Sequence, residues 1–108
     1  MAKTELLSGT LDLLILRVLN GGPLHGFAIV ERIFVLSREV LTVEEGSLYP
    51  SLYRMEAKGW IEAEWGQSDK GRRAKFYTLT KEGRKQLENE RQIWDRVALA
   101  IEDVLRGA

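Results

Sequence analysis

Cysteine is absent from the 108-residue sequence, and histidine and proline are scarce: His25 is the one histidine, and Pro23 and Pro50 are the two prolines. The lack of cysteine excludes a disulfide framework, a thiolate metal site and a cysteine nucleophile. A single histidine excludes a histidine-rich metal site and gives the serines no histidine partner nearby in the sequence. We therefore expect no metal, no cofactor and no enzymatic activity.

Long apolar runs and an excess of one charge are also missing. The most apolar stretch, Leu11 to Leu19, is interrupted by Asp12 and Arg17, so a membrane-spanning helix is not expected. Residues 1–5 lack the basic and apolar zones of a secretory signal, which favours a cytoplasmic protein. Sixteen acidic and sixteen basic side chains cancel, so an argument for nucleic acid depends on where the charges lie.

What the chain does contain is enough apolar material, 44% of its residues, for one core. The spacing of these residues predicts a first helix that begins after Ser8 or Thr10, because either hydroxyl can cap a helix. Residues 21–23 (Gly-Gly-Pro) end it.

A second helix is predicted to start at Leu24 or His25 and to fade near Ser37. Its broad apolar stripe, which includes Phe27, indicates that the helix is short and mostly buried. His25 is interpreted as a residue that starts this helix or packs against it, since a lone histidine offers no metal site.

Residues 42–45 (Thr-Val-Glu-Glu) have the Thr-x-x-Glu form of a capping box, which predicts the start of a third helix. Proline is tolerated in a first turn, so Pro50 moves the expected start of the regular helix toward Gly46 or Ser47. The inner face carries Leu48, Leu52 and Met55. Residues 58–59 (Lys-Gly) are expected to end the helix.

Two strands and a long helix complete the predicted order. Residues 61–65 and 74–79 alternate apolar and polar side chains, and the turn-rich residues 66–73 between them predict a hairpin with a charged tip. Thr80 caps a last helix of about 25 residues, or nearly 40 Å. Large apolar groups recur on this helix as a seam made by Leu87, Trp94, Val97, Ile101 and Val104.

Three helices followed by a hairpin form the order of a winged helix-turn-helix. The expected fold is therefore mainly α with a small β-hairpin, divided into a winged helix-turn-helix domain at residues 1–80 and a C-terminal dimerisation helix at residues 81–108. In such a fold the third helix can enter a major groove, and the hairpin tip can reach the DNA backbone.

The charges of the hairpin fit this placement. Four basic residues, Lys70, Arg72, Arg73 and Lys75, stand against the single acid Asp69, and such a concentrated cationic loop suits phosphates. The alternative is that a solvated hairpin tip is simply charged.

Outside its inner face, the third helix presents hydroxyl, aromatic and guanidinium groups that can contact phosphates or base edges. The residues expected on this outward face are Ser47, Tyr49, Pro50, Ser51, Tyr53 and Arg54. Glu44 and Glu45, which would repel DNA if they faced it, are expected to cap the positive start of the helix.

The apolar seam predicts a homodimer, because a long helix would otherwise expose it to water. A two-fold partner would bury the seam and set two recognition helices near one DNA turn apart, about 34 Å. The first helix is expected to share the interface. The alternative is a seam that folds back onto its own core.

Five motifs together resemble PadR-like transcriptional regulators: residues 11–16 (LDLLIL), 22–27 (GPLHGF), 45–52 (EGSLYPSL), 59–61 (GWI) and 71–80 (GRRAKFYTLT). The resemblance implies a bacterial or archaeal regulator, usually a repressor, that binds an inverted-repeat operator as a homodimer. It implies the short subfamily, with one helix after the hairpin. By this resemblance, DNA is contacted by Ser47, Tyr49, Pro50, Tyr53 and Arg54 of the third helix and by Lys70, Arg72, Arg73 and Lys75 of the wing.

The resemblance also implies a ligand site, because certain PadR-like proteins bind flat aromatic compounds at the dimer interface. We hypothesise that Trp94 and its symmetry mate line such a cavity, with Ile15, Val97, Ala98 and Ile101 nearby. The alternative for Trp94 is an interface anchor without a ligand. The alternative for the whole chain is a winged-helix interaction module that dimerises or joins a protein assembly without touching DNA.

Overall fold

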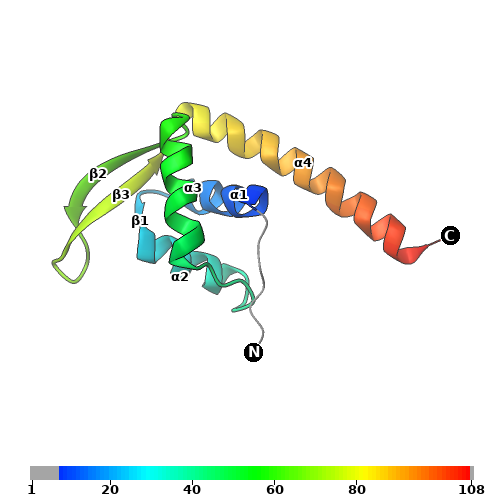
Figure 1. Ribbon diagram of the computed structural model, residues 1–108, viewed down its shortest axis with the longest axis horizontal. Helices are drawn as coiled ribbons and strands as arrows, with labels where there is room; N and C mark the ends of the chain where they lie inside the picture. Colours follow the sequence, from blue (N-terminus) through cyan, green and yellow to red (C-terminus); the bar gives the residue numbers. More distant parts are fainter. Residues whose placement is uncertain (1–7, 108) are drawn as a thin grey trace.

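The computed structural model describes residues 8–107 and places a long helix beside a small helical head with a hairpin (Figure 1). The elements in chain order are α1 (Ser8–Leu19), β1 (Leu24–His25), α2 (Gly26–Leu36), α3 (Glu45–Ala57), β2 (Ile61–Gln67), β3 (Arg73–Leu79) and α4 (Lys81–Arg106). The hairpin and the C-terminal end of α4 lie at opposite ends of the long axis (Figure 1). The predicted mainly helical winged helix-turn-helix with a long last helix is confirmed.

Helix α1 begins at Ser8 and ends at Leu19, ahead of the predicted stop. Thr10 lies inside the helix and is not its cap. A cap before Ser8 falls outside the described residues.

The sheet has three antiparallel strands in the order β1-β3-β2, one more than the sequence predicted. Tyr77 of β3 is the central position, paired with Leu24 on one side and Ala63 on the other. Strand β1 was missed because two residues are too few to show an alternating pattern. It attaches the start of α2 to the base of the hairpin.

His25 lies at the N-cap of α2, where its Nδ1 accepts a hydrogen bond of 3.2 Å from the backbone N–H of Ala28. The interpretation of His25 as a helix-start residue is therefore confirmed. Phe27, expected in the buried stripe of α2, is instead 70% exposed. It lies in the first turn, beyond the reach of the core that covers Ile29 and Ile33.

Helix α3 begins at Glu45, with Glu44 at the N-cap. Thr42 lies two residues before the cap, so the predicted capping box was wrong, and the expected start near Gly46 or Ser47 was one or two residues late. Pro50 is accommodated inside the helix at an exposed position, where only the backbone hydrogen bond to the carbonyl of Gly46 is lost.

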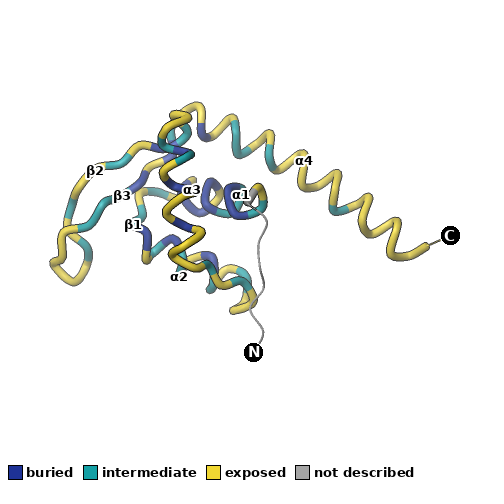
Figure 2. Tube along the Cα trace, in the orientation of Figure 1, coloured by how far each residue is buried: buried dark blue, intermediate teal, exposed yellow. Residues whose placement is uncertain are grey.

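Thr80 caps α4 as predicted: its Oγ1 accepts a hydrogen bond of 3.0 Å from the N–H of Gly83 and donates one of 2.6 Å to the carbonyl of Gly59. The 26 residues of α4 span about 39 Å. Its first turns pack against the head, and most of the remaining length is exposed (Figure 2).

The core lies where α1, α2 and α3 meet the sheet. The fully buried large side chains are Ile15, Leu16, Leu19, Ile29, Leu48, Leu52, Met55 and Ile61. Within residues 8–107, no helix has the length and apolar content that crossing a membrane requires.

Candidate nucleic-acid interface

The outward face of α3 carries aromatic and small polar side chains. Tyr53 is 78% exposed, and Ser47, Tyr49 and Pro50 are also exposed. Ser51 is only 3% exposed, so its expected place on this face was wrong. Because Ser51 follows Leu48 by three residues, it shares the buried side of the helix.

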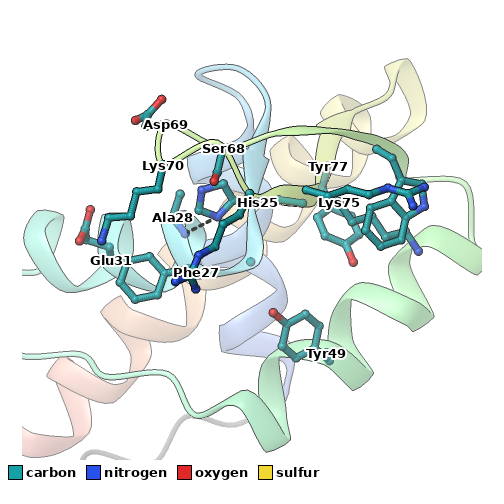
Figure 3. Close-up of a pocket in the computed structure, with 15 residues that line it drawn as sticks. His25, Phe27, Ala28, Glu31, Tyr49, Ser68, Asp69, Lys70, Lys75 and Tyr77 are labelled. Carbon is teal, nitrogen blue, oxygen red and sulfur yellow. Dashed lines mark hydrogen bonds between the residues drawn. The ribbon is translucent and has the colours of Figure 1, made fainter.

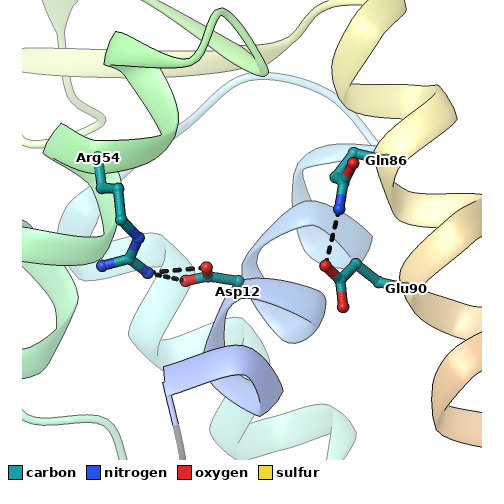
Figure 4. A network of polar contacts seen from close by, with 4 residues as sticks. All are labelled: Asp12, Arg54, Gln86 and Glu90. Carbon is teal, nitrogen blue, oxygen red and sulfur yellow. Dashed lines mark hydrogen bonds and ion pairs between the residues drawn. The ribbon is translucent and has the colours of Figure 1, made fainter.

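We call Ser47, Tyr49, Pro50, Tyr53 and Arg54 the recognition face. Arg54 differs from the others because its guanidinium is engaged within the protein: Nη2 donates to both carboxylate oxygens of Asp12 at 2.7 Å. Asp12 lies on α1, so this pair joins α1 to α3 (Figure 4).

The hairpin tip is a tight turn between β2 and β3. The N–H of Ser68 donates to the carbonyl of Arg72 at 2.8 Å, and the N–H of Gly71 donates back to the carbonyl of Ser68 at 2.8 Å. Gly71 has a φ of 76°, a conformation that glycine adopts without strain. The turn leaves Lys70 and Arg72 exposed at the end of the wing.

The other two basic residues of the wing are held by neighbours. The guanidinium of Arg73 lies 4.6 Å from the ring centroid of Trp65, the residue of β2 that faces it diagonally. Lys75 lies 3.6 Å from a carboxylate oxygen of Glu56 on α3 and 5.8 Å from the ring centroid of Tyr77. Lys75 therefore joins the wing to α3, whereas Lys70 and Arg72 extend beyond it.

A groove of about 950 Å³ separates the wing from the starts of α2 and α3 (Figure 3). Phe27 from α2, Tyr49 from α3 and Trp65 from β2 contribute its aromatic groups. The full set of wing cations, Lys70, Arg72, Arg73 and Lys75, lines the same groove. Sequence reasoning missed Phe27 and Trp65 here, although the charged turn after Trp65 was a usable signal.

The ring of Tyr49 on α3 reaches the start of α2 at this groove. A side chain at Gly26 would collide with the Tyr49 hydroxyl, so the ring lies directly against the start of α2. Tyr77 lies in the groove floor, where burial raises the pKa of its phenol, and the nearby Glu56 and Tyr49 raise it further.

Away from the groove, α4 presents the apolar seam. Leu87 packs against the core, whereas Trp94, Val97, Ile101 and Val104 are exposed. A shallow groove of about 280 Å³ runs along Val97, Ala100, Ile101, Val104 and Leu105.

Of the residues named for a ligand cavity, Ile15 is placed differently from the others. It is fully buried in the core of the single chain, and its place near a cavity at the dimer interface stays a prediction. Ala98 is partly buried, and Trp94, Val97 and Ile101 are on the open part of α4. Among the described residues, no group of three histidine or carboxylate side chains could hold a metal ion.

A three-helix head, a cationic wing and an exposed helix face bordering one groove define a winged-helix DNA-binding protein. The family model described as the transcriptional regulator PadR-like family matches residues 15–89. The chain therefore belongs to the PadR-like family of transcriptional regulators. This confirms the resemblance drawn from the sequence motifs and the expectation that the protein is not an enzyme.

Solved structures support the same assignment. A PadR-like transcriptional regulator from Bacillus cereus is 30% identical, with a TM-score of 0.79 over 97% of this chain and 100% of that chain. A PadR family transcription regulator from Clostridium difficile is 31% identical, with a TM-score of 0.74 over 88% of this chain and 97% of that chain. Among curated proteins, an uncharacterized protein from Lysinibacillus sphaericus is 28% identical over 107 residues, or 99% of this chain and 98% of that protein.

Proposed function

We propose that this regulator is a cytoplasmic repressor that binds an inverted-repeat operator as a homodimer. In this proposal, the recognition face of α3 enters the major groove of each half-site, and Lys70, Arg72 and Arg73 contact the adjacent phosphates. The observation that carries it is the groove itself, because Tyr49 of the recognition face lines it together with all four wing cations.

The apolar seam of α4 supports the dimer. Beyond Leu87 the helix projects away from the head, and Val104 near its end is 78% exposed. Contiguous apolar side chains of this kind mark interaction surfaces, and a second copy would cover them by two-fold symmetry. In the proposed arrangement, residues 1–80 form the DNA-binding domain and residues 81–108 the dimerisation helix, with α1 contributing to the interface.

The proposal is tested by selecting bound fragments from a random duplex library and titrating the selected duplex against a scrambled duplex at two salt concentrations. We expect an inverted repeat that binds at least a thousandfold more tightly than the scrambled sequence, as specific regulators do. If no sequence is enriched and both duplexes bind weakly, the proposal is contradicted. The alternative, a winged-helix interaction module that does not bind DNA, would then be favoured.

We further propose that a flat aromatic ligand binds between the two copies of Trp94 and releases the protein from the operator. Trp94, Val97, Ala98 and Ile101 supply the apolar surface, and Trp94 supplies a ring for stacking. Quenching of Trp94 fluorescence by planar phenolic acids or drugs, in a variant with Trp60→Phe and Trp65→Phe, is the expected result. If no compound quenches Trp94, the tryptophan is an anchor of the dimer and no more.

A further inference from the structure

The ion pair between Asp12 and Arg54 is the most buried one in the described chain. The side chain of Asp12 is 12% exposed and that of Arg54 is 39% exposed, whereas each of the other ion pairs between described residues has both side chains at least 38% exposed. The two residues are 42 positions apart in the sequence. A buried carboxylate of this kind requires its cation, so the pair fixes the rotamer of Arg54.

Only one edge of the Arg54 guanidinium is used by this pair. Nη2 makes both contacts with Asp12, and within residues 8–107 Nη1 and Nε have no further hydrogen bond or ion pair. In Figure 4, Nη1 of Arg54 points away from Asp12. A guanidinium has five N–H donors in a planar fork, so it can hold a carboxylate on one side and a phosphate or a guanine edge on the other.

The pair also connects two parts of the molecule. Helix α1 contacts both α3 and α4, and Asp12 lies on α1 between them. Leu11 and Ile15, on either side of Asp12 in the helix, are buried in the core, so Asp12 cannot follow Arg54 if α3 moves. The position of the guanidinium is thus set by the core of the head and not by solvent.

We propose that Asp12 is a positioning residue for operator recognition: it holds one edge of the Arg54 guanidinium so that the other edge is presented, without loss of side-chain entropy, to the DNA. This inference rests on the proposed function. It gives a role in DNA binding to a residue that itself stays out of reach of the DNA.

The sign of the effect makes the proposal testable. Removing a negative charge from a DNA-binding protein favours DNA binding through long-range electrostatics. The proposal predicts the opposite for Asp12→Asn: operator affinity falls about tenfold, the size of one good base contact, and affinity for scrambled DNA changes little. Asp12→Glu, which keeps the charge, should recover part of the loss.

The experiment titrates the selected inverted repeat and its scrambled counterpart with the wild type, Asp12→Asn, Asp12→Glu and the exposed control Asp95→Asn, below the thermal midpoint of each variant. Asp95→Asn should bind as the wild type does or slightly more tightly. In an Arg54→Gln background, Asp12→Asn should cost no further operator affinity, because the residue it positions is gone. A purely structural role for Asp12 would instead lower the thermal midpoint and leave the ratio between operator and scrambled DNA unchanged.

Equal or tighter operator binding by folded Asp12→Asn would overturn the inference and leave the proposed function intact, since Asp12 would then only sequester or stabilise Arg54. Failure of the wild type to select any operator would overturn both. If Asp12→Asn does not fold, the comparison of Asp12→Glu with the wild type decides: unchanged affinity and unchanged specificity with the longer side chain would contradict a positioning role.

Discussion

Gly83 lies where the first turn of α4 crosses the backbone that follows α3. A Cβ at this position would overlap the carbonyl oxygen of Trp60 and press on the side chain of Leu79. Close by, the Thr80 hydroxyl shares its proton between the carbonyls of Gly59 and Trp60, and the Thr80 N–H also donates to the carbonyl of Trp60. A single missing side chain therefore fixes the angle at which the long helix leaves the head.

We expect Gly83→Ala to destabilise the protein by about 2 kcal/mol or more, since the backbone of Trp60 must shift to admit the methyl group. Thermal denaturation measures this effect. Gly9→Ala is the matched control: it is also a helical glycine, but nothing lies within 4 Å of its added Cβ. An equal loss at both positions would contradict the packing argument.

Tyr53 is the recognition-face residue with the clearest separation of roles. Its ring is exposed and not part of the core, whereas Tyr49 also packs against Gly26. Tyr53→Ala should therefore leave the thermal midpoint near that of the wild type and reduce the gap between operator and scrambled DNA by about 1–3 kcal/mol. If the difference in binding free energy between operator and scrambled DNA does not change, Tyr53 does not contact the bases.

At the level of the elements, the wing is a short hairpin joined to α3 along β3 and free at its tip. Lys75 of β3 contacts Glu56 of α3, and Arg73 packs over Trp65 within the hairpin. Lys70 and Arg72 extend into solvent. The four cations, which look equivalent in the sequence, are thus expected to differ in their share of DNA contacts.

We expect Arg72→Ala combined with Arg73→Ala to weaken binding to every DNA sequence alike. The slope of log affinity against log salt should become shallower by about 0.9 for each phosphate that the wing no longer neutralises. Lys85→Ala with Arg96→Ala, on the polar side of α4, removes the same charge and should leave the slope near the wild-type value. Unchanged DNA affinity in the wing variant would show that the wing does not contact the DNA.

The elements themselves were largely predictable, because helical spacing, the alternation of the hairpin and the Thr80 cap are local signals. The misses arose where tertiary contacts decide. Strand β1 exists because β3 offers it an edge, and α3 begins before the point that Pro50 suggested because the helix accommodates the proline at an exposed interior position. Phe27 was assigned to the wrong environment because the extent of the surrounding core decides which positions near a helix end are covered. Ser51 was assigned to the outward face although its spacing of three residues from Leu48 places it on the buried side.

The recognition face and the wing could likewise be named from the sequence, since charge and helix phase locate them. The groove between them and the Asp12–Arg54 pair could not, because both join residues far apart in the chain. At the level of the whole molecule, the exposed apolar seam of α4 is the feature that favours association with a second copy of the chain.

We expect Ile101→Asp with Val104→Asp to convert the proposed dimer to a monomer of 12.3 kDa, measured by sedimentation or light scattering. Burying two carboxylates against apolar partners costs several kcal/mol, and this cost opposes association. The control is Leu99→Asp: Leu99 is also exposed, but it lies two residues from Ile101 and so about 200° around the helix. A dimer that survives the first substitution and not the second would place the interface on the other side of α4.

The head lies at one end of α4 and the seam occupies the rest of the helix. In the proposed dimer, α4 therefore acts as a ruler: it sets the distance between the two heads. The separation of the two recognition faces depends on where along this ruler two copies cross. A slip of one helical turn moves each crossing point by about 5.4 Å, which corresponds to about one and a half base pairs of B-DNA. Substitutions in the seam that exchange large and small side chains would thus alter the preferred gap between half-sites while every residue that touches the DNA stays the same.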